Sequence, residues 1–514
     1  MPAPVTLSEA LRGAGVLRRI GGDVAVTGVE YDSRRVEPGS LFVAMQGETT
    51  DGNRYIEQAV ARGAVAVVTD SAAAYDATGD GPLDVALAEV PHGRRALATI
   101  AANVFGHPER NIPLSGVTGT NGKTTTAYLL EQLLRAAGRS TALVGTIEYR
   151  IAGEVRPAPH TTPESRDFLA LLAEGVERGV TEGVMEVSSH ALEQGRVWGV
   201  PYDVAIFTNL TQDHLDYHGS MDAYFAAKRK LFDGSQVHET GARPPRVAVL
   251  NAEDDTQAAL VETAQTAGSA IWSYGAERGD FHARDIVMRP NGMRFTLVSP
   301  QGEAPVEVAL TGRVNVLNLL AASAAALARG LSLAQIAAAA PKLRAVPGRF
   351  EAVDAGQPFT VVVDYAHTDD ALRNVLALAR DLVSAKHKGE KPGRVLTVFG
   401  CGGDRDRSKR PRMGRAAAEA SEIVIVTSDN PRSEDPRAII DEILPGTAGS
   451  SATVEVEPDR AKAIALAVTK ARAGDIVVIA GKGHEKTQTI GKQILPFDDV
   501  RVAREALAWL RGKA

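Results

Sequence analysis

The sequence predicts an α/β protein of three domains, in which a central P-loop ATPase domain with a parallel sheet lies between an N-terminal α/β domain and a C-terminal Rossmann-like domain. The first reason is a glycine-rich loop at residues 115–125, which follows an apolar strand and opens a helical pattern. The second is the alternation of strand and helix patterns around that loop, which is typical of parallel sheets. The third is the length of 514 residues, which corresponds to several domains. We expect the domains to be 1–112, 113–345 and 346–514.

The composition is that of an ordinary globular protein, with 44% hydrophobic and 23% charged residues. A net charge of −6 argues against non-specific nucleic-acid binding, which needs a basic face. The single cysteine, Cys401, excludes a disulfide framework and a cysteine-based zinc site. We find no signal-peptide pattern and no apolar run of bilayer length. We therefore expect a cytoplasmic enzyme with small-molecule partners, without a nucleic-acid or membrane partner.

The first domain has strand patterns at residues 24–31, 41–44 and 63–68. The turn after the first of these strands holds Ser33 beside two arginines. Such a turn could contact an anion. A solvated turn that ends at a Pro-Gly pair is an equal alternative, and the spacing alone does not decide between them.

The glycine-rich loop predicts nucleotide binding. Gly119 and Gly122 allow backbone N–H groups to close around phosphates, and the following helix adds partial positive charge at its N-terminus. Lys123 can reach the terminal phosphates, and the Thr124 hydroxyl can bind Mg²⁺. Val117 stands where the usual P-loop has its first glycine, so the loop is a variant. A plain glycine-rich turn is the less favoured interpretation.

The central domain is expected to bring a carboxylate and an imidazole close to this loop. Glu186 lies within one predicted strand and His214 lies just past another. Ligands of an open parallel sheet gather at the carboxyl ends of its strands, so both side chains can approach the phosphates, and Glu186 is a plausible Mg²⁺ partner. A solvent-facing strand residue and a loop-capping histidine are the structural alternatives. The predicted strands of this domain are 141–147, 183–187, 204–210 and 247–251.

Two further residues of the central domain are ambiguous by pattern. Lys228 lies on a predicted helix at 224–232, and because helical lysines are mostly solvated, the pattern gives it no role. Asn315 stands where an alanine-rich helix begins. It could cap that helix or present its amide to the edge of a nucleobase.

The third domain has four apolar strands that each end in a polar cluster. Arg405 and Arg432 can fork onto carboxylates, while Asp429 and Glu485 can receive ammonium groups. Such a rim suits a zwitterion such as an amino acid. An ATP site together with an amino-acid site suggests a ligase that phosphorylates a carboxylate and lets an amine attack it. The strands are 360–363, 395–399, 423–426 and 476–479, and the clusters are 364–367, 400–407, 429–432 and 481–485.

These motifs resemble the Mur ligases of peptidoglycan synthesis over essentially the whole chain. The stretches that carry the resemblance are 118–125, 185–190, 209–216, 312–318, 347–351 and 364–367. Within the family, the segments 400–405, 429–432 and 481–485 resemble those of the members that add diaminopimelate. Diaminopimelate carries a distal carboxylate that lysine lacks, and Arg432 supplies a cation for it.

The resemblance implies that ATP phosphorylates the γ-carboxylate of UDP-N-acetylmuramoyl-L-alanyl-D-glutamate, and that the amine of diaminopimelate then attacks the acyl phosphate. It implies ATP and Mg²⁺ as cofactors and a carbamate on Lys228, which converts a cation into an anion that can serve Mg²⁺. A monomer is the expected state. The stereoisomer of diaminopimelate remains open.

The resemblance also carries a set of site residues over to this chain. ATP binding falls on Gly119, Thr120, Asn121, Gly122, Lys123, Thr124, Thr125 and Asn315. Metal binding and catalysis fall on Lys123, Thr124, Glu186, His214 and carbamylated Lys228. The residues implied to bind the UDP-linked substrate are Ser33, Thr161, Thr162, Ser188, Gln194 and Arg196. The residues implied to bind diaminopimelate are Arg405, Asp429, Asn430, Pro431, Arg432, Gly481 and Glu485.

Two departures and three alternatives remain at this point. Asp369 stands where the family pattern has proline, and His160 stands where some relatives have asparagine. A lysine-adding homologue would share the mechanism with another acceptor. Folylpolyglutamate synthases share the central and C-terminal plan but lack the first domain and the Asp-Asn-Pro-Arg stretch. A non-catalytic P-loop switch would leave the polar clusters of the third domain unexplained.

Overall fold

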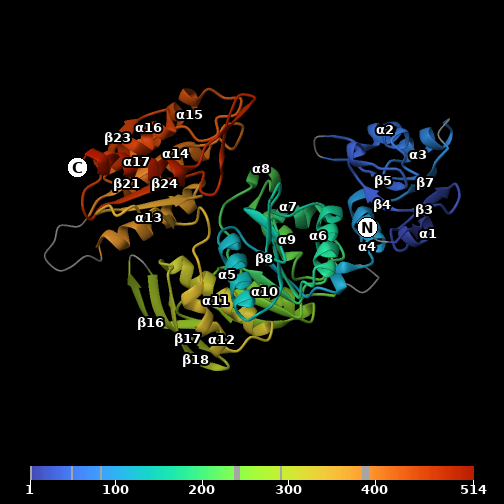
Figure 1. Ribbon diagram of the computed structural model, residues 1–514, viewed down its shortest axis with the longest axis horizontal. Coiled ribbons are helices and arrows are strands. Elements are labelled where there is room, and N and C mark those ends of the chain that lie inside the picture. Colours follow the sequence, from blue (N-terminus) through green and yellow to red (C-terminus); the bar gives the residue numbers. More distant parts are fainter. Residues whose placement is uncertain are drawn as a thin grey trace.

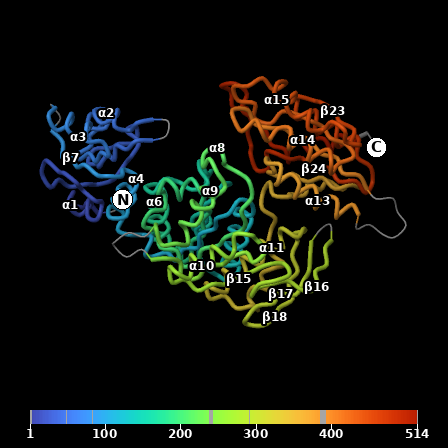
Figure 2. The backbone as a smooth tube through the Cα atoms, turned by 180° about the vertical axis from the view of Figure 1, so that it is seen from behind, coloured from blue at the N-terminus to red at the C-terminus, as the bar shows by residue number. Residues whose placement is uncertain are grey.

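The computed structural model describes residues 3–47, 50–81, 84–236, 243–289, 292–384 and 393–513. Three sheet-bearing domains follow one another along the chain, with the central domain between the other two (Figures 1 and 2). The predicted α/β class with three domains is confirmed. Within the described ranges, we find no helix that is both long and apolar enough to cross a membrane.

The N-terminal domain contains a five-stranded sheet of order β2-β7-β6-β5-β4. The expected single strand at 24–31 is wrong, because the chain changes sheets at Thr27, whose backbone N–H donates to the Gly39 carbonyl. β3 pairs with β1 before this residue, and β4 joins the main sheet after it. The strands are β1 Val5–Thr6, β2 Arg18–Ile20, β3 Ala25–Val26, β4 Gly28–Glu30, β5 Ser40–Ala44, β6 Ala66–Thr69 and β7 Ala86–Glu89. The helices are α1 Leu7–Ala10, α2 Ile56–Ala61, α3 Ala72–Gly79 and α4 Gly93–Val104.

The central domain is built on an eight-stranded sheet of order β11-β10-β9-β12-β8-β13-β14-β15, in which the six strands from β9 to β15 run parallel. The strands are β8 Leu114–Thr118, β9 Thr141–Val144, β10 Glu148–Ile151, β11 Glu154–Pro157, β12 Glu182–Glu186, β13 Val204–Phe207, β14 Val247–Asn251 and β15 Ala270–Tyr274. The helices are α5 Lys123–Ala136, α6 Ser165–Glu177, α7 Ser189–Gln194, α8 Leu215–His218, α9 Met221–Arg229, α10 Gln257–Thr266, α11 Arg313–Ala328 and α12 Leu333–Ala339.

A three-stranded antiparallel sheet completes the central domain, and the strand–helix alternation did not predict it. Its strands are β16 His282–Arg289, β17 Gly292–Ser299 and β18 Gly302–Val308. The buried face of this sheet packs on the alanine-rich helix α11, which joins it to the same hydrophobic core as α5. The expected strand 141–147 is also shorter, because the chain turns after Val144 into the antiparallel strand β10.

The C-terminal domain has a six-stranded sheet of order β19-β20-β24-β21-β22-β23, parallel except for β19. All four predicted strands are present in it, and each is buried between helices on both faces. The strands are β19 Glu351–Ala352, β20 Thr360–Asp364, β21 Val395–Phe399, β22 Ile423–Val426, β23 Thr453–Val456, β24 Ile476–Ala480, β25 Thr487–Ile490 and β26 Gln493–Pro496. The helices are α13 Asp369–Ser384, α14 Lys409–Ala420, α15 Pro436–Ile443, α16 Arg460–Lys470 and α17 Asp499–Lys513.

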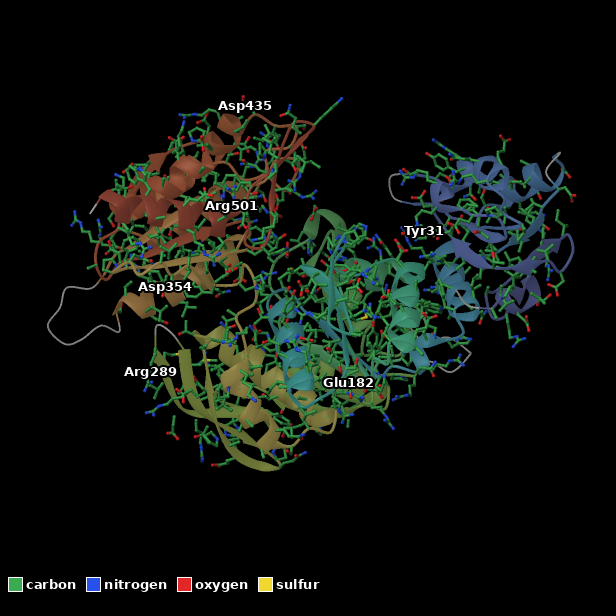
Figure 3. All side chains as sticks on the ribbon, in the orientation of Figure 1. Tyr31, Glu182, Arg289, Asp354, Asp435 and Arg501 are labelled. Atoms are coloured by element: carbon green, nitrogen blue, oxygen red, sulfur yellow. The ribbon has the colours of Figure 1, made fainter. Side chains whose placement is uncertain are left out.

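The N-terminal and central domains are joined by a polar seam over a continuous hydrophobic core. Tyr31, on the face directed at the central domain (Figure 3), donates from its hydroxyl to Asp167 at 2.6 Å. Arg166 forms a 2.6 Å ion pair with Glu30 beside it. The core beneath runs from α4 into α6. This seam therefore places the N-terminal domain against α6, away from the glycine-rich loop.

Candidate active site

Two adjoining cavities lie between the central and C-terminal domains. One, of about 290 Å³, is lined by the glycine-rich loop, Glu186, Lys228 and Asn315. The other, of about 380 Å³, is lined by the polar clusters of the C-terminal domain. The residues common to both walls are Asp213, His214, Tyr365, His367 and Thr368. A group held in one cavity can therefore meet a group held in the other.

The glycine-rich loop folds tightly between β8 and α5. Gly119 has φ of +142°, and a Cβ there would lie 1.9 Å from the Thr208 hydroxyl, so no larger residue fits. Lys123 donates from Nζ to the carbonyls of Gly119 at 2.9 Å and Thr120 at 2.8 Å. Burial lowers the pKa of Lys123. The ammonium group therefore lies inside the loop, where phosphates are bound in P-loop proteins.

Glu186 is held at the mouth of this loop by the register of the sheet. It is the last residue of β12 and lies opposite Val117 on β8. Its fully buried carboxylate accepts hydrogen bonds from the Thr124 hydroxyl at 2.8 Å and from the Thr146 backbone N–H at 2.8 Å. A buried carboxylate beside a threonine hydroxyl is a donor set of the oxygen type that Mg²⁺ prefers. The solvent-facing alternative for Glu186 is wrong.

Lys228 is buried, contrary to its interpretation from the helix pattern. Its side chain is 1% exposed, Nζ donates to the Gly119 carbonyl at 2.6 Å, and the ammonium lies 4.3 Å from the centre of the Tyr224 ring. Burial lowers its pKa well below the ordinary value, and Lys123 nearby adds to this. Burial therefore favours the neutral amine, which is the form that reacts with CO₂.

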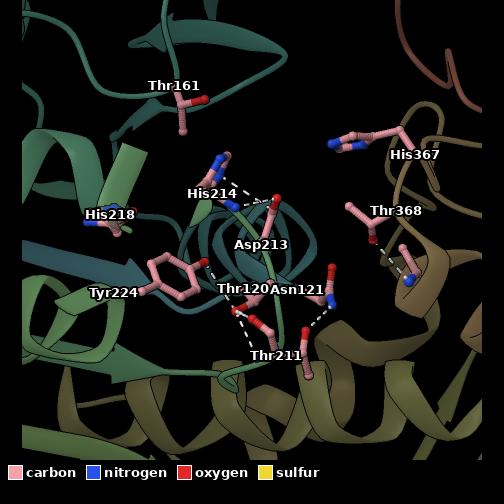
Figure 4. Close-up of polar contacts among 12 residues, drawn as sticks. Thr120, Asn121, Thr161, Thr211, Asp213, His214, His218, Tyr224, His367 and Thr368 are labelled. Atoms are coloured by element: carbon pink, nitrogen blue, oxygen red, sulfur yellow. Dashed lines mark hydrogen bonds and ion pairs between the residues drawn. The ribbon is translucent and has the colours of Figure 1, made fainter. Parts of the chain in front are cut away.

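His214 and Asp213 belong to the wall that both cavities share. His214 has a left-handed backbone with φ of +52°, and its Nε2 lies 3.4 Å from Oδ2 of Asp213 (Figure 4). Burial lowers the pKa of His214. Burial raises the pKa of Asp213, but the nearby His214, His367 and Lys123 outweigh burial, and the pKa is lowered overall. The pair therefore presents a neutral imidazole next to an ionised carboxylate.

Asn315 lies in the first turn of α11 and lines the cavity that contains the glycine-rich loop. Its amide donates to the Thr311 carbonyl at 2.8 Å and its oxygen accepts from Asn318 at 3.3 Å. The helix begins after Gly312, so the interpretation of Asn315 as the N-cap is wrong. The remaining loop residues Thr120, Asn121, Gly122 and Thr125 line the same cavity.

The residues expected to hold the sugar and peptide of the substrate form one network in the central domain. Thr162 donates to the Glu186 carbonyl at 2.8 Å and accepts from the Ser188 backbone N–H at 3.0 Å. Arg196 donates to the carbonyl of Thr162 at 3.1 Å and to Gln194 at 2.9 Å. This network is therefore attached to the backbone of Glu186.

Thr161 and Ser33 differ in how they relate to this network. The Thr161 hydroxyl lies 3.1 Å from that of Thr146, which itself contacts Glu186. Ser33 lies on the N-terminal domain, in a short 3₁₀ turn at Ser33–Arg35, and donates to Gln58 of its own domain at 2.9 Å. The structure therefore does not bring Ser33 together with the other expected substrate contacts.

In the C-terminal cavity, Asn430 and Glu485 are held by a buried lysine. Lys482, which is 0% exposed, donates to Oε2 of Glu485 at 2.8 Å and to Oδ1 of Asn430 at 3.2 Å. Asn430 in turn donates from Nδ2 to the same Glu485 oxygen at 2.8 Å. Gly481 has φ of +116°, and a Cβ there would lie 2.5 Å from Oδ2 of Asp429. The carboxylates of Asp429 and Glu485 therefore belong to residues that line the same cavity.

The cationic side of the cavity comes from Arg432 and Arg405. Arg432 has a left-handed backbone with φ of +51°, follows Pro431, and donates to the Gly403 carbonyl at 2.6 Å. Arg405 donates to the carbonyl of Asp404 at 3.4 Å, and both guanidinium groups line the cavity. The cavity is therefore lined by both cationic and anionic side chains, as a zwitterionic ligand requires.

Several residues at the site received no role from the sequence. Arg349 donates to the Thr124 hydroxyl at 3.2 Å and lies over the Tyr365 ring at 4.7 Å. His367 belongs to both cavities. Asp370 contacts the glycine-rich loop, and Lys482 supports Glu485. Arg349, His367 and Lys482 lay within recognised motifs, but only the fold shows where their side chains lie.

Comparison with known proteins gives the same family along the chain. Residues 25–105 match the model described as Mur ligase family, catalytic domain. Residues 117–326 match the Mur ligase middle domain, and 348–483 match the Mur ligase glutamate ligase domain. A protein of Solibacter usitatus named UDP-N-acetylmuramoyl-L-alanyl-D-glutamate–2,6-diaminopimelate ligase is 50% identical over 506 residues, which cover 98% of each chain.

Solved structures show the same similarity. A structure of a UDP-N-acetylmuramoyl-L-alanyl-D-glutamate–2,6-diaminopimelate ligase is 34% identical, with a TM-score of 0.68 over 99% of this chain and 100% of that one. Folylpolyglutamate synthase of Mycobacterium tuberculosis, complexed with ADP and AMPPCP, is 18% identical, with a TM-score of 0.61 over 82% of this chain and 96% of that one. The second similarity concerns the fold alone.

Proposed function

Because this chain belongs to the Mur ligase family, we propose that it is the ATP-dependent ligase that joins diaminopimelate to UDP-N-acetylmuramoyl-L-alanyl-D-glutamate in peptidoglycan precursor synthesis. The relative with 50% identity over 98% of both chains bears the name of that activity. The observation that carries the proposal is the meeting of two cavities, one lined by the glycine-rich loop and one lined by both cationic and anionic side chains.

We assign ATP to the cavity of the glycine-rich loop. Lys123 and the backbone N–H groups of residues 119–125 would hold its phosphates, and Asn315 would lie near the base. Thr124, Glu186, His214 and Lys228 as its carbamate would hold Mg²⁺. When bound, Mg²⁺ neutralises charge on the transferred phosphoryl group. The oxygen donors already gathered at Glu186 fit such an ion.

The UDP-linked substrate would extend from the N-terminal domain to this point. Ser33 would contact the UDP part, and the central-domain network would hold the sugar and peptide. That network consists of Thr161, Thr162, Ser188, Gln194 and Arg196. Since Thr162 is bonded to the Glu186 carbonyl, the network can hold the D-glutamate γ-carboxylate next to the ATP phosphates.

Diaminopimelate would occupy the second cavity. Arg405 and Arg432 would bind carboxylates, and Asp429 and Glu485 would receive ammonium groups, with the Asn430–Pro431 and Gly481 backbones shaping the wall. A lysine side chain would leave one of these cations without a partner, which disfavours lysine as the acceptor.

The reaction then follows from the placement of the two cavities. The γ-carboxylate attacks the terminal phosphate of ATP and becomes an acyl phosphate. The acceptor amine, held across the shared wall, attacks the acyl carbon, and phosphate leaves from the tetrahedral intermediate. Closure of the junction around the substrates would exclude water, which would otherwise hydrolyse the acyl phosphate. Residues 1–112, 113–345 and 346–514 are proposed as the units that bind the UDP-linked substrate, ATP and diaminopimelate in a cytoplasmic monomer.

The decisive experiment is phosphate release with ATP, Mg²⁺ and UDP-N-acetylmuramoyl-L-alanyl-D-glutamate. Meso-diaminopimelate, LL-diaminopimelate and L-lysine are added in separate reactions. We expect release with a diaminopimelate isomer and little with lysine. Equal release with lysine would remove the acceptor specificity. No release with any acceptor, in a protein that still binds ATP, would contradict the ligase and favour a folate-type ligase or a nucleotide switch.

A further inference from the structure

His367 is one of the five residues that line both cavities, and its neutral tautomer is fixed by the backbone. Its Nδ1 lies 2.9 Å from the Tyr365 carbonyl oxygen. A carbonyl oxygen can only accept, so Nδ1 carries the ring proton and Nε2 carries the lone pair. Among the described residues, no hydrogen bond is made to Nε2. Figure 4 shows the ring directed from the C-terminal domain toward His214 and Asp213.

The proposed reaction requires a proton acceptor at this junction. An amino-acid amine is protonated at neutral pH, and its nitrogen has no lone pair for attack until one proton has left. The acceptor is held in one cavity and the acyl phosphate forms in the other. A base must therefore lie on the wall that both cavities share, and His367 belongs to that wall.

We propose that His367 is the general base of the amide-forming step, with Nε2 accepting a proton from the acceptor ammonium. This inference rests on the ligase function proposed above. The neutral nitrogen then forms a C–N bond to the acyl carbon. The C–O bond to phosphate breaks, and phosphate leaves with the bonding electron pair. The second nitrogen proton passes to the departing phosphate, and the imidazolium returns its proton to solvent.

The surroundings of His367 keep the ring unprotonated before substrates bind. Burial lowers its pKa, Lys409 and Arg349 act in the same direction, and Asp213 opposes them. Lys409 also donates from Nζ to the His367 carbonyl at 2.9 Å, which fixes the loop. The charged and titratable groups facing His367 are Asp213 and His214 before α8, Arg349 before β19, Tyr365 beside it, Lys409 on α14 and His484 after β24.

Other groups at the junction are less suited to this role. Lys409 is already engaged by a carbonyl, and as a cation it repels an incoming ammonium. Asp213 remains ionised and is suited to attract the ammonium rather than to take its proton. His214 belongs to the proposed metal donors.

The test compares two variants whose amides cannot accept the proton. In His367→Asn, the side-chain amide can still donate to the Tyr365 carbonyl, and in His367→Gln the amide lies near the former Nε2. The matched control is His282→Asn on β16. Nδ1 of His282 also lies next to a backbone carbonyl, 3.1 Å from the oxygen of Gly279, and His282 lines neither cavity.

Three readouts separate chemistry from structure. Isotope scrambling in the β,γ-bridge of ATP, measured with the UDP-linked dipeptide and no acceptor, reports acyl-phosphate formation. Steady-state kcat with diaminopimelate reports the whole reaction. Hydroxylamine, an uncharged nucleophile at neutral pH, traps the acyl phosphate without a base.

We expect both His367 variants to lower kcat by about 10²–10⁴-fold while scrambling and hydroxamate formation stay within about twofold of wild type. The pH profile of kcat should also lose its acidic limb. Retained scrambling shows that the variants are folded. A kcat near wild type in either folded variant, or a parallel loss of scrambling, would overturn the assignment. Absence of acceptor-dependent turnover in the wild type would instead contradict the proposed ligase function itself.

Discussion

Asn121 donates from its side-chain amide to Oδ2 of Asp370 at 2.9 Å, and this bond joins the glycine-rich loop to the first turn of α13 in another domain. Thr211 donates to the same oxygen at 3.0 Å. The C-terminal domain therefore touches the loop where ATP is proposed to bind. If ATP binds there, this carboxylate would link nucleotide binding to the position of the C-terminal domain.

Replacing that carboxylate tests the coupling. Asp370→Ala removes the two side-chain hydrogen bonds to the central domain, each with a net value of about 0.5–1.5 kcal/mol, and a weaker one from Asn374 on its own helix. We expect the affinity for ATP to fall several-fold and the average spacing of the domains, measured by X-ray scattering, to increase. Asp381→Ala on the exposed face of the same helix is the control. Unchanged ATP affinity in Asp370→Ala would show that the contact is incidental.

Lys228 should be indispensable as its carbamate. Lys228→Ala is expected to lower kcat by about 10²–10³-fold, the usual effect of removing one group that stabilises charge in a transition state. A short-chain carboxylic acid that enters the vacated space should restore part of the rate. Lys230→Ala is the control, because Lys230 is paired with Glu193 on the surface. A fully active Lys228→Ala variant would exclude the carbamate.

Lys482 should determine affinity for the acceptor without affecting ATP. Lys482→Met removes the cation that holds Glu485 and Asn430. Because 31% of the Glu485 side chain is exposed, water can solvate its carboxylate, and this reduces the cost of losing the ion pair. We expect KM for diaminopimelate to rise about 10–100-fold, which corresponds to about 1.4–2.7 kcal/mol. KM for ATP should stay unchanged. Lys486→Met, which breaks an outer pair with Asp498, serves as the comparison.

Stability at acidic pH should depend on His484. Burial, with Arg349 and Lys486 nearby, lowers its pKa from 6.5 to about 3, so the folded protein binds fewer protons than the unfolded chain between these values. The stabilisation is complete above 6.5 and is lost as the pH falls toward 3, with a slope of up to about 1.4 kcal/mol per pH unit. His484→Asn should flatten the pH dependence of the thermal midpoint below pH 6.5. An identical slope in wild type and variant would contradict this.

The proposed metal site can be probed through Glu186. Glu186→Gln keeps the shape of the side chain but removes the negative charge that would face Mg²⁺. We expect the Mg²⁺ concentration for half-maximal activity to rise at least about tenfold, as for loss of a direct or supporting metal ligand. Glu177→Gln on the exposed end of α6 is the control. An unchanged Mg²⁺ dependence would remove Glu186 from the metal donors.

The sequence predicted the parallel-sheet framework well because its signals are local. Buried strands such as Val395–Phe399 and Ile423–Val426 are continuous apolar runs, and their bounds agree with the structure residue by residue. The glycine-rich loop was equally clear, since Gly119 and Gly122 mark backbone conformations that other residues avoid. The antiparallel strands β16–β18 were missed. Buried and more exposed residues alternate along β17 and β18, so these strands are not continuous apolar runs, and they lie in a domain that was expected to alternate strands with helices.

By itself, the sequence determined the fold class, the nucleotide loop and the polar clusters, since each depends on residues adjacent in the chain. Only the tertiary structure decided which side chains share one space. Lys228 reads as a surface lysine on its helix, yet packing encloses it against the carbonyl of Gly119, 109 positions away. His367 lines both cavities because the central and C-terminal domains meet around it. Burial and contact between distant segments are properties of packing, and they set the charge and pKa of these groups.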